Sequence, residues 1–303
     1  MRFGVQGSGQ LVGELPSPEH FADVARLAEA RGFDSLWAGD HVSFEHPILD
    51  VTVALSVFAA VTSRVTIGAA ILLLPLRPPA LVAKAFSSLD YLARGRVVLG
   101  IGVGGEGAKD FEAVGVPIGE RGARADEAMV VLRELFARSP ASFDGRFTRF
   151  EGVAIEPRGD GPPLWVGGRA AAALRRAGRL GDGWIPIWVS PERYVESWSE
   201  VRRHAEAAGR DPGAIEPAVT LPSVVDDDGE RARREAREAL SLRYGTEFSP
   251  HAIERYCVAG TTEECAARIQ AYAEAGVRHV VFNPAVPATR LGEQIEALAE
   301  VAA

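Results

Sequence analysis

The feature that most constrains the fold is a repeated alternation of short β-branched runs with longer alanine-rich segments. The runs are apolar throughout, which is typical of strands buried on both faces of a parallel sheet. We expect these strands at residues 2–7, 34–39, 65–72, 97–103, 164–167, 183–188, 216–225 and 279–283. We expect helices at 18–31, 50–62, 78–93, 122–138, 170–180, 191–208, 229–244, 261–276 and from about 289. A strand followed by a helix, repeated about eight times, predicts a parallel sheet that is either open or closed into a barrel.

The alternation is interrupted twice, near residues 139–162 and 225–260. In the first interruption, Asp144 and Gly145 lie between β-forming residues, a pattern that predicts a hairpin. No Pro/Gly/Ser-rich linker or change of composition divides the chain. The sequence therefore predicts one domain over residues 1–303, an α/β barrel with two insertions.

Charge and cysteine content restrict the partners. The net charge of -8 argues against nucleic acid and anionic membranes, because phosphate binding depends on excess positive charge. The longest apolar run, near "IGAAILLLPL", is too short to span a bilayer. Cys257 and Cys265 form neither a disulfide framework nor a metal-binding spacing. We expect a cytoplasmic protein that acts on a small molecule.

Residues 97–107, "VVLGIGVGGEG", contain a G-x-G-x-x-G motif. A dinucleotide-binding turn would need a helix directly after the glycines and a second strand ending in an acid about 20 residues later. No β-forming run follows at that distance, so a nicotinamide dehydrogenase is a distant alternative. In a closed barrel the strand ends would meet at one mouth. There, glycines 102 to 105 would let the backbone pass close under a flat ligand that Glu106 faces.

Other predicted strands end in residues suited to the same mouth. "LWVGGRAAAALRRAG" reads as a strand, two glycines and a helix, and the amides of such a helix start bind phosphate. Trp188 follows the sixth strand and is a candidate for lining the pocket. The second strand ends in Asp40 and His41, and an imidazole can accept a proton from a substrate alcohol. Because adjacent residues on a strand face opposite ways, Asp40 reaches the pocket only if the strand has already broken.

The same stretch, "DHVSFEH", also offers Asp40, His41, Glu45 and His46 as metal ligands. The spacing H-x3-E-H differs by one residue from the H-x2-E-H pattern, which would rotate one ligand off a helix face. We therefore expect no metal site.

Four longer segments resemble the bacterial luciferase-like monooxygenase superfamily, and most of all its branch that uses the deazaflavin coenzyme F420. These are "FDSLWAGDHV", "LLLPLRPPALVAKAFSSLDYLARGRVVLGIGVG", "PPLWVGGRAAAALRRAGRLGDGW" and "AGTTEECAARIQAYAEAGVRHVVF". The similarity spans nearly the whole chain in the same order. It implies a (β/α)8 TIM barrel with insertions that binds FMN or F420 at the carboxyl ends of its strands and often forms homodimers.

The resemblance also implies roles for particular residues. Asp40 and His41 match an acid-histidine pair in which the histidine lies beside the reactive carbon of the cofactor. Glu106 approximately matches a glutamate that donates or accepts a proton in the glucose-6-phosphate-oxidising members. The cofactor-binding positions implied or inferred above are Ala70, Ile71 and Leu72 around a non-proline cis peptide, Gly104 and Gly105, the phosphate turn Val166, Gly167 and Gly168, and Trp188.

These features predict an oxidoreductase that transfers a hydride between coenzyme F420 and a small organic substrate. Two alternatives remain open from the residues: an FMN-dependent monooxygenase, and a non-catalytic flavin-binding relative. Asp40 and His41 favour the F420-dependent oxidoreductase over the FMN-dependent monooxygenase. At the substrate end, the sequence shows no cluster of lysines or arginines clearly placed for a sugar phosphate, so the resemblance does not identify the substrate.

Overall fold

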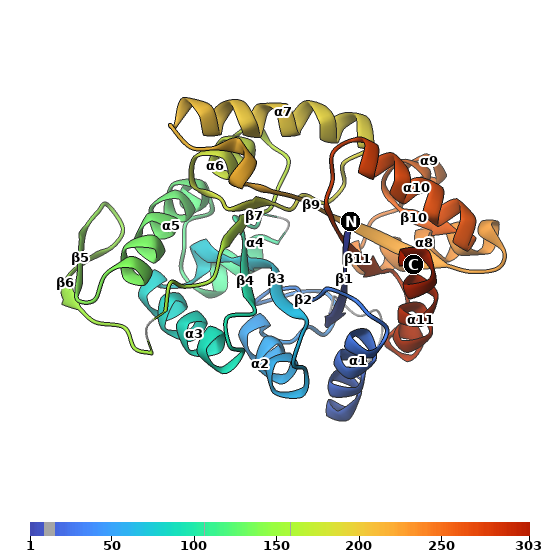
Figure 1. Cartoon of the computed structure of the whole chain (residues 1–303), viewed down its shortest axis with the longest axis horizontal. Coiled ribbons are helices and arrows are strands. Elements are labelled where there is room, and N and C mark those ends of the chain that lie inside the picture. The colour runs from blue at the N-terminus through green and yellow to red at the C-terminus, as the bar shows by residue number, and fades with distance from the viewer. Residues whose placement is uncertain (9–15, 106, 158) are drawn as a thin grey trace.

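The computed structural model describes residues 1–8, 16–105, 107–157 and 159–303 (Figure 1). Within these residues the main sheet has nine strands. Neighbours in the sheet follow the order β10 (Val258–Gly260), β9 (Glu216–Val225), β11 (His279–Pro284), β1 (Arg2–Ser8), β2 (Ser35–Ala38), β3 (Thr66–Leu73), β4 (Val97–Gly102), β7 (Leu164–Val166) and β8 (Gly183–Trp184). A further parallel pairing of β8 with β9 closes eight of them into a ring and leaves β10 outside it. The predicted TIM barrel is confirmed.

The helices surround the ring and mostly begin and end within two residues of the predicted positions (Figure 1). They are α1 (Pro18–Ala30), α2 (Val51–Val61), α3 (Pro79–Leu92), α4 (Ala108–Ala113), α5 (Arg121–Ala137), α6 (Ala171–Leu180), α7 (Pro191–Ala207), α8 (Gly229–Tyr244), α9 (Pro250–Tyr256), α10 (Thr262–Glu274) and α11 (Leu291–Ala302). The sequence analysis missed α4, α9 and β10. Each has seven residues or fewer, too few to show a clear periodicity.

Local hydrogen bonds explain several of these boundaries. α10 begins with a capping box, in which the side chain of Thr261 accepts from the amide of Glu264 and the side chain of Glu264 accepts from the amide of Thr261. Asp50 caps α2 by accepting from the amides of the second and third residues beyond it. Such caps satisfy amides that the first turn of a helix leaves unpaired, so they fix where the helix starts.

Two features break the regular alternation. β5 (Ala141–Asp144) and β6 (Arg149–Val153) form an antiparallel hairpin after α5, where Asp144 and Gly145 predicted one. The second interruption contains α8, α9 and β10. Among the described helices, none combines the length and the apolar character needed to cross a membrane.

Two indole rings fill part of the interior of the barrel. Trp37 on β2 and Trp165 on β7 lie with ring centroids 5.3 Å apart. Neighbouring strands carry glycines at these levels, since an added Cβ at Gly68 would lie 2.3 Å from Trp37 and one at Gly183 would lie 2.6 Å from Trp165. Tryptophans on some strands therefore lie opposite glycines on their neighbours, and the indole rings fill the interior of the barrel at this level.

A buried histidine lies against both rings. His279 on β11 is 2% exposed, and its Nε2 lies 2.7 Å from the Oγ of Ser35, which also accepts a hydrogen bond from the indole of Trp37. Its Nδ1 is buried without a hydrogen-bond partner. Burial, with a smaller effect of the positive charge of Arg2, lowers the pKa of His279 to about 3. The ring is therefore neutral in the folded protein at pH 7.

Candidate active site at the carboxyl ends of the strands

All strands of the ring run parallel, so the segments that follow them gather at one rim. The sequence-predicted residues lie in the last residues of, or just after, β2, β3, β4, β7 and β8, and the structure therefore brings them to the same end of the barrel. Glu106 lies outside the described residues.

His41 is held by an aspartate that the sequence analysis did not single out. Its Nδ1 lies 2.9 Å from Oδ2 of Asp110, in the first turn of α4, and both side chains are largely buried. The other oxygen of Asp110 accepts from the amides of Val42 and Ser43, each at 2.8 Å. The ring of Phe44 stacks on the imidazole at 4.5 Å. The carboxylate and the phenyl ring together fix the position and rotation of the imidazole.

This arrangement determines which nitrogen of His41 can react. A carboxylate accepts hydrogen bonds, so the Nδ1 of His41 carries the proton that it donates to Asp110. In the neutral ring, Nε2 then keeps the lone pair and can accept a proton from another molecule. The signal for Asp110 in the sequence was weak, because it is one of two acids in a helix of six residues and lies 69 positions away from the histidine.

Asp40 has a different environment from that of His41. Its two carboxylate oxygens accept from both terminal nitrogens of Arg77, at 2.6 and 2.8 Å, and one also accepts from the amide of Leu73. Burial alone would lower the pKa of Arg77, but hydrogen bonds to Asp40 and Asp50 raise it above its ordinary value. Asp40 thus ties the loop after β2 to the loop after β3. Because Arg77 and the amide of Leu73 engage both of its oxygens, we propose that Asp40 positions these loops.

The peptide between Ala70 and Ile71 is cis, as the family resemblance implied. The pairing of β3 with β4 shifts register between Ala69 and Leu72 at the same place. The carbonyl of Ala70 accepts from the side chain of Gln6 on β1, and both Ala70 and Ile71 are half-buried. The bulge therefore lies at the mouth of the barrel. By contrast, the side chain of Leu72 is fully buried in the core between the sheet and the helices. Contrary to the prediction, it does not face the mouth.

The structure explains the presence of glycine in β4 differently from the sequence analysis. A Cβ at Gly100 would lie 2.1 Å from the carbonyl of Ala69, and one at Gly102 would lie 1.9 Å from the side chain of Ile71. These glycines therefore accommodate the bulge of β3, and the expectation that Gly102 makes room for a ligand was wrong. Gly104 and Gly105, beyond the strand, have φ of 65° and 123°, which explains why the turn requires glycine.

The turn after β7 contains both expected and unexpected features. The amide of Gly167 donates to the carbonyl of Ile101 within the sheet, so it is not available to a phosphate. Val166 is fully buried in the outer core and faces away from the mouth, which also corrects the prediction. Gly168 has a φ of 98°, and its carbonyl accepts from the indole of Trp184. α6 begins three residues later without a side-chain cap, so its first amides remain suited to an anion.

Trp188 belongs to an aromatic wall made of Trp188, Tyr244, Phe248 and Tyr256. Trp188 has a φ of 61°, which is rare for a bulky residue. Its ring centroid lies 5.7 Å from Tyr244, 5.3 Å from Phe248 and 6.4 Å from Tyr256. The Nε2 of His46 lies 2.9 Å from the carbonyl of Leu242 near the end of α8, so this wall is tied to the loop that carries His41.

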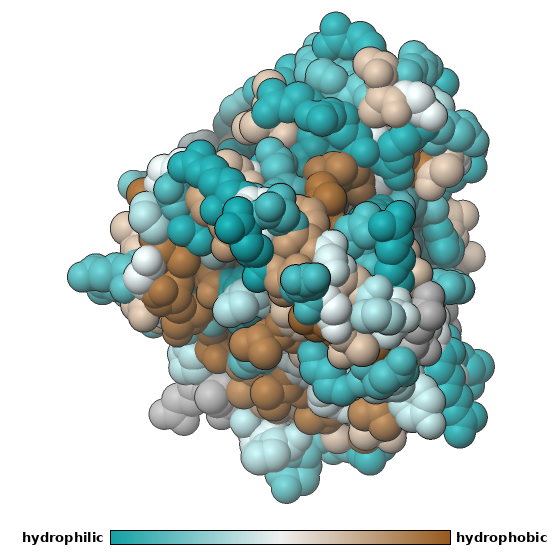
Figure 2. Space-filling view, turned by 90° about the vertical axis from the view of Figure 1, so that its left-hand side faces the viewer, coloured by the Kyte–Doolittle hydropathy of each residue, from teal (hydrophilic) through white to brown (hydrophobic). Residues whose placement is uncertain are grey.

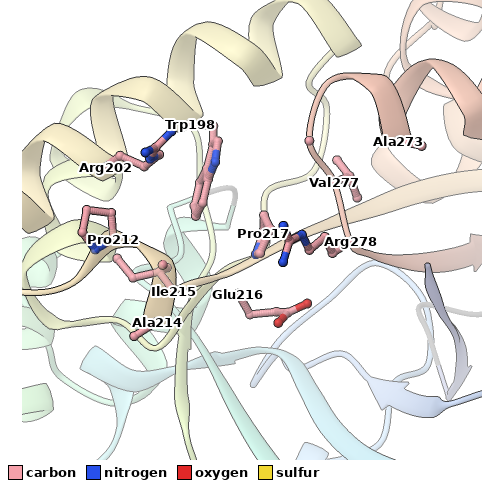
Figure 3. Close-up of a pocket in the computed structure, with 12 residues that line it drawn as sticks. Trp198, Arg202, Pro212, Ala214, Ile215, Glu216, Pro217, Ala273, Val277 and Arg278 are labelled. Carbon is pink, nitrogen blue, oxygen red and sulfur yellow. The ribbon is translucent and has the colours of Figure 1, made fainter.

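A separate cavity of about 510 Å³ lies at the opposite end of the barrel (Figure 3). Trp198 and Arg202 of α7 line one side of it, while Glu216 at the start of β9 and Arg278 just before β11 line the other. These residues lie at the amino ends of the strands. In TIM-barrel enzymes the chemistry takes place at the carboxyl ends, so this cavity is not part of the candidate site.

Comparisons with known proteins agree with this geometry. The sequence model of the family described as luciferase-like monooxygenase matches residues 1–279. The chain belongs to the luciferase-like monooxygenase family.

One relative in this family is named F420-dependent glucose-6-phosphate dehydrogenase, from Kineococcus radiotolerans. It is 31% identical over 299 residues, which cover 88% of this chain and 87% of the relative. Monooxygenase RslO1 from Streptomyces bottropensis has a similar structure, with a TM-score of 0.87, 25% identity and coverage of 99% and 98% of the two chains. An F420-dependent secondary alcohol dehydrogenase in complex with an F420-acetone adduct shares the fold, with a TM-score of 0.87, 23% identity and coverage of 99% and 97%.

Proposed function

We propose that this protein is an oxidoreductase that transfers a hydride between coenzyme F420 and a small organic substrate. The observation that carries the proposal is the His41–Asp110 pair, which leaves a proton-accepting nitrogen at the mouth of a luciferase-like barrel. The relatives named F420-dependent glucose-6-phosphate dehydrogenase, with 30 to 31% identity, support the choice of cofactor.

The residues present fit a flat cofactor with a phosphate. The half-buried bulge at Ala70 and Ile71 offers a surface for a ring system. The uncapped start of α6 beyond Gly168 offers amides and a favourable helix dipole to a phosphate. When bound, F420 supplies the carbon that accepts or donates the hydride. As an alcohol loses hydride from its carbon, the Nε2 of His41 accepts the proton from its oxygen, and Asp110 stabilises the imidazolium that forms.

Cofactor choice is tested by titrating the purified protein with F420 and with FMN while monitoring tryptophan fluorescence. We expect F420 to quench the fluorescence at a concentration at least ~10-fold lower than FMN, a preference of about 1.4 kcal/mol. The similarity to monooxygenase RslO1 makes an FMN-dependent monooxygenase the second candidate. Tight binding of FMN without binding of F420 would favour that candidate. Binding of a cofactor with no turnover of any alcohol or carbonyl compound would favour a non-catalytic relative.

We further propose that residues 1–303 act as one domain and that the protein works in the cytoplasm. Pairing of the first strand, β1, with the last, β11, supports a single folding unit. The two cysteines, Cys257 and Cys265, are buried as unpaired thiols, and burial raises the pKa of each to about 12. Thiols kept in this form suit a reducing compartment.

A homodimer is proposed from the apolar residues exposed on two neighbouring helices. Leu81, Tyr91 and Leu92 on α3 are 66 to 69% exposed, and Val53 on α2 is 59% exposed. Figure 2 shows apolar residues gathered in the lower half of the face on which α3 lies. Sedimentation equilibrium should give a dimer of the native protein and a monomer of the double variant Leu81→Glu/Leu92→Glu. Val195→Glu, at an apolar residue of α7 that is 48% exposed, is the matched control and should stay dimeric. A monomeric native protein would contradict the proposal.

A further inference from the structure

A buried arginine lies beside the candidate site without a carboxylate partner in the described part of the chain. Arg243 is 1% exposed, near the end of α8. Its terminal nitrogens donate to the side chain of Asn283, at 3.3 Å, and to the carbonyl of Pro284, at 3.0 Å. Its Nε is buried without any acceptor. Burying a guanidinium without an opposite charge costs free energy of folding, and leaving one of its N–H groups without an acceptor adds to that cost. Buried N–H groups without an acceptor are therefore rare in folded proteins.

The position of Arg243 connects it to the mouth of the barrel. Asn283 continues the alternation of His279 and Val281, whose side chains belong to the barrel interior, and it lies at the carboxyl end of β11. Ser223 of β9, which pairs with Pro284, also has a buried hydroxyl without a partner. Two unsatisfied polar groups thus flank the same carboxyl ends of β9 and β11.

The aromatic wall begins at the next residue. Tyr244 follows Arg243 directly, and its ring and those of Trp188 and Phe248 lie within 6 Å of one another, centroid to centroid. The loop of His41 contacts the same end of α8 through His46 and Leu242. A cation and an apolar aromatic surface are therefore adjacent in the chain, at the end of α8 that the loop of His41 contacts.

We propose that Arg243 determines substrate specificity by binding a carboxylate of the substrate, and that the aromatic wall packs against a flat apolar body. This inference rests on the proposed function for the reaction, but the ligand class follows from the residues alone. A monoanionic carboxylate suits the one guanidinium N–H of Arg243 that has no acceptor. A sugar phosphate, with its polar body, does not suit the aromatic surface of Trp188, Tyr244 and Phe248.

The test compares two probes that share a ring system, 2-naphthoate and the neutral 2-naphthamide. Their binding is measured by isothermal titration calorimetry on the full-length protein, with and without saturating F420. We expect the native protein to bind naphthoate at least about 10-fold more tightly than naphthamide, as a charge-assisted hydrogen bond allows. Arg243→Met should raise the Kd for naphthoate about 10- to 100-fold and leave the Kd for naphthamide unchanged.

Arg202→Met is the matched control, because it removes the same charge from the cavity at the opposite end of the barrel (Figure 3). It should retain the preference for naphthoate. Arg243→Lys, which keeps the charge, should retain part of the preference and covers the case in which Arg243→Met does not fold, as judged by circular dichroism. Three results would overturn the inference: no preference in the native protein, loss of the preference in Arg202→Met alone, or tighter binding of glucose 6-phosphate than of naphthoate.

F420 affinity, followed separately by absorbance, distinguishes this inference from the proposed function. A native protein that does not bind F420 would contradict the proposed function, whichever probe it prefers. A native protein that binds F420 but does not discriminate between the probes would contradict only the role of Arg243.

Discussion

Replacing His41 with alanine is expected to lower kcat by about 10²- to 10⁴-fold, the usual contribution of a general acid or base. The Nε2 of His41 would accept the proton of the substrate in the transition state, so the loss should appear in turnover rather than in cofactor affinity. The Kd for F420, measured by fluorescence quenching, should change by less than about 3-fold. Steady-state kinetics with a substrate identified by screening alcohols and organic acids gives kcat.

Two variants serve as comparisons for His41→Ala. Asp110→Asn keeps the shape of the side chain but removes the charge that holds the Nδ1 of His41, so it should lower kcat by less and alter the pH profile of kcat. Gly168→Val should have the opposite signature, a higher Kd for F420 with kcat at saturation nearly unchanged, because a side chain at a φ of 98° distorts the turn before α6. If His41→Ala weakened only F420 binding, the proposed role in proton transfer would be wrong.

The free energy of unfolding is expected to fall steeply with acidity because of His279. The pKa of this residue is about 3 in the folded protein, against an ordinary value of 6.5, because burial disfavours the imidazolium. The unfolded chain therefore binds a proton below pH 6.5 that the folded chain does not bind until about pH 3. The contribution of His279 to stability is fully present above pH 6.5 and is lost as the pH falls, by about 1.4 kcal/mol per pH unit. Over the whole interval it amounts to about 4 to 5 kcal/mol.

Urea unfolding of the native protein and of His279→Gln, at intervals between pH 7 and pH 4, isolates this contribution. The difference between their unfolding free energies should decrease toward acid at close to the predicted slope, whatever the offset at pH 7. His251→Gln, at an exposed position, controls for the loss of a histidine in general. Parallel pH profiles for the native protein and His279→Gln would show that the buried imidazole is not the source of acid sensitivity.

Much of the fold could be predicted because its signal is local. Helices such as α8 and α10 show their apolar face every three to four residues, and their ends carry recognisable caps, Asp228 and Thr261. The strands of a parallel barrel are buried on both faces, so they appear as short apolar runs. The parallel direction in turn places every strand end at one rim, so that His41 and the glycine at 168 could be assigned to one site in advance. The bulge at Ala70 was implied by the family resemblance.

What the sequence alone determined is therefore the series of elements, the barrel and the rim at which the site lies. The tertiary structure alone decided which side chains meet there. It paired His41 with Asp110 across 69 positions, directed Asp40 to Arg77, filled the space at Gly102 with Ile71 and left Arg243 without a carboxylate among the described residues. Periodicity records how each residue is buried relative to its neighbours in the chain. Contacts between distant residues depend instead on strand order, register and side-chain rotation. None of these can be deduced from the periodicity of a single sequence.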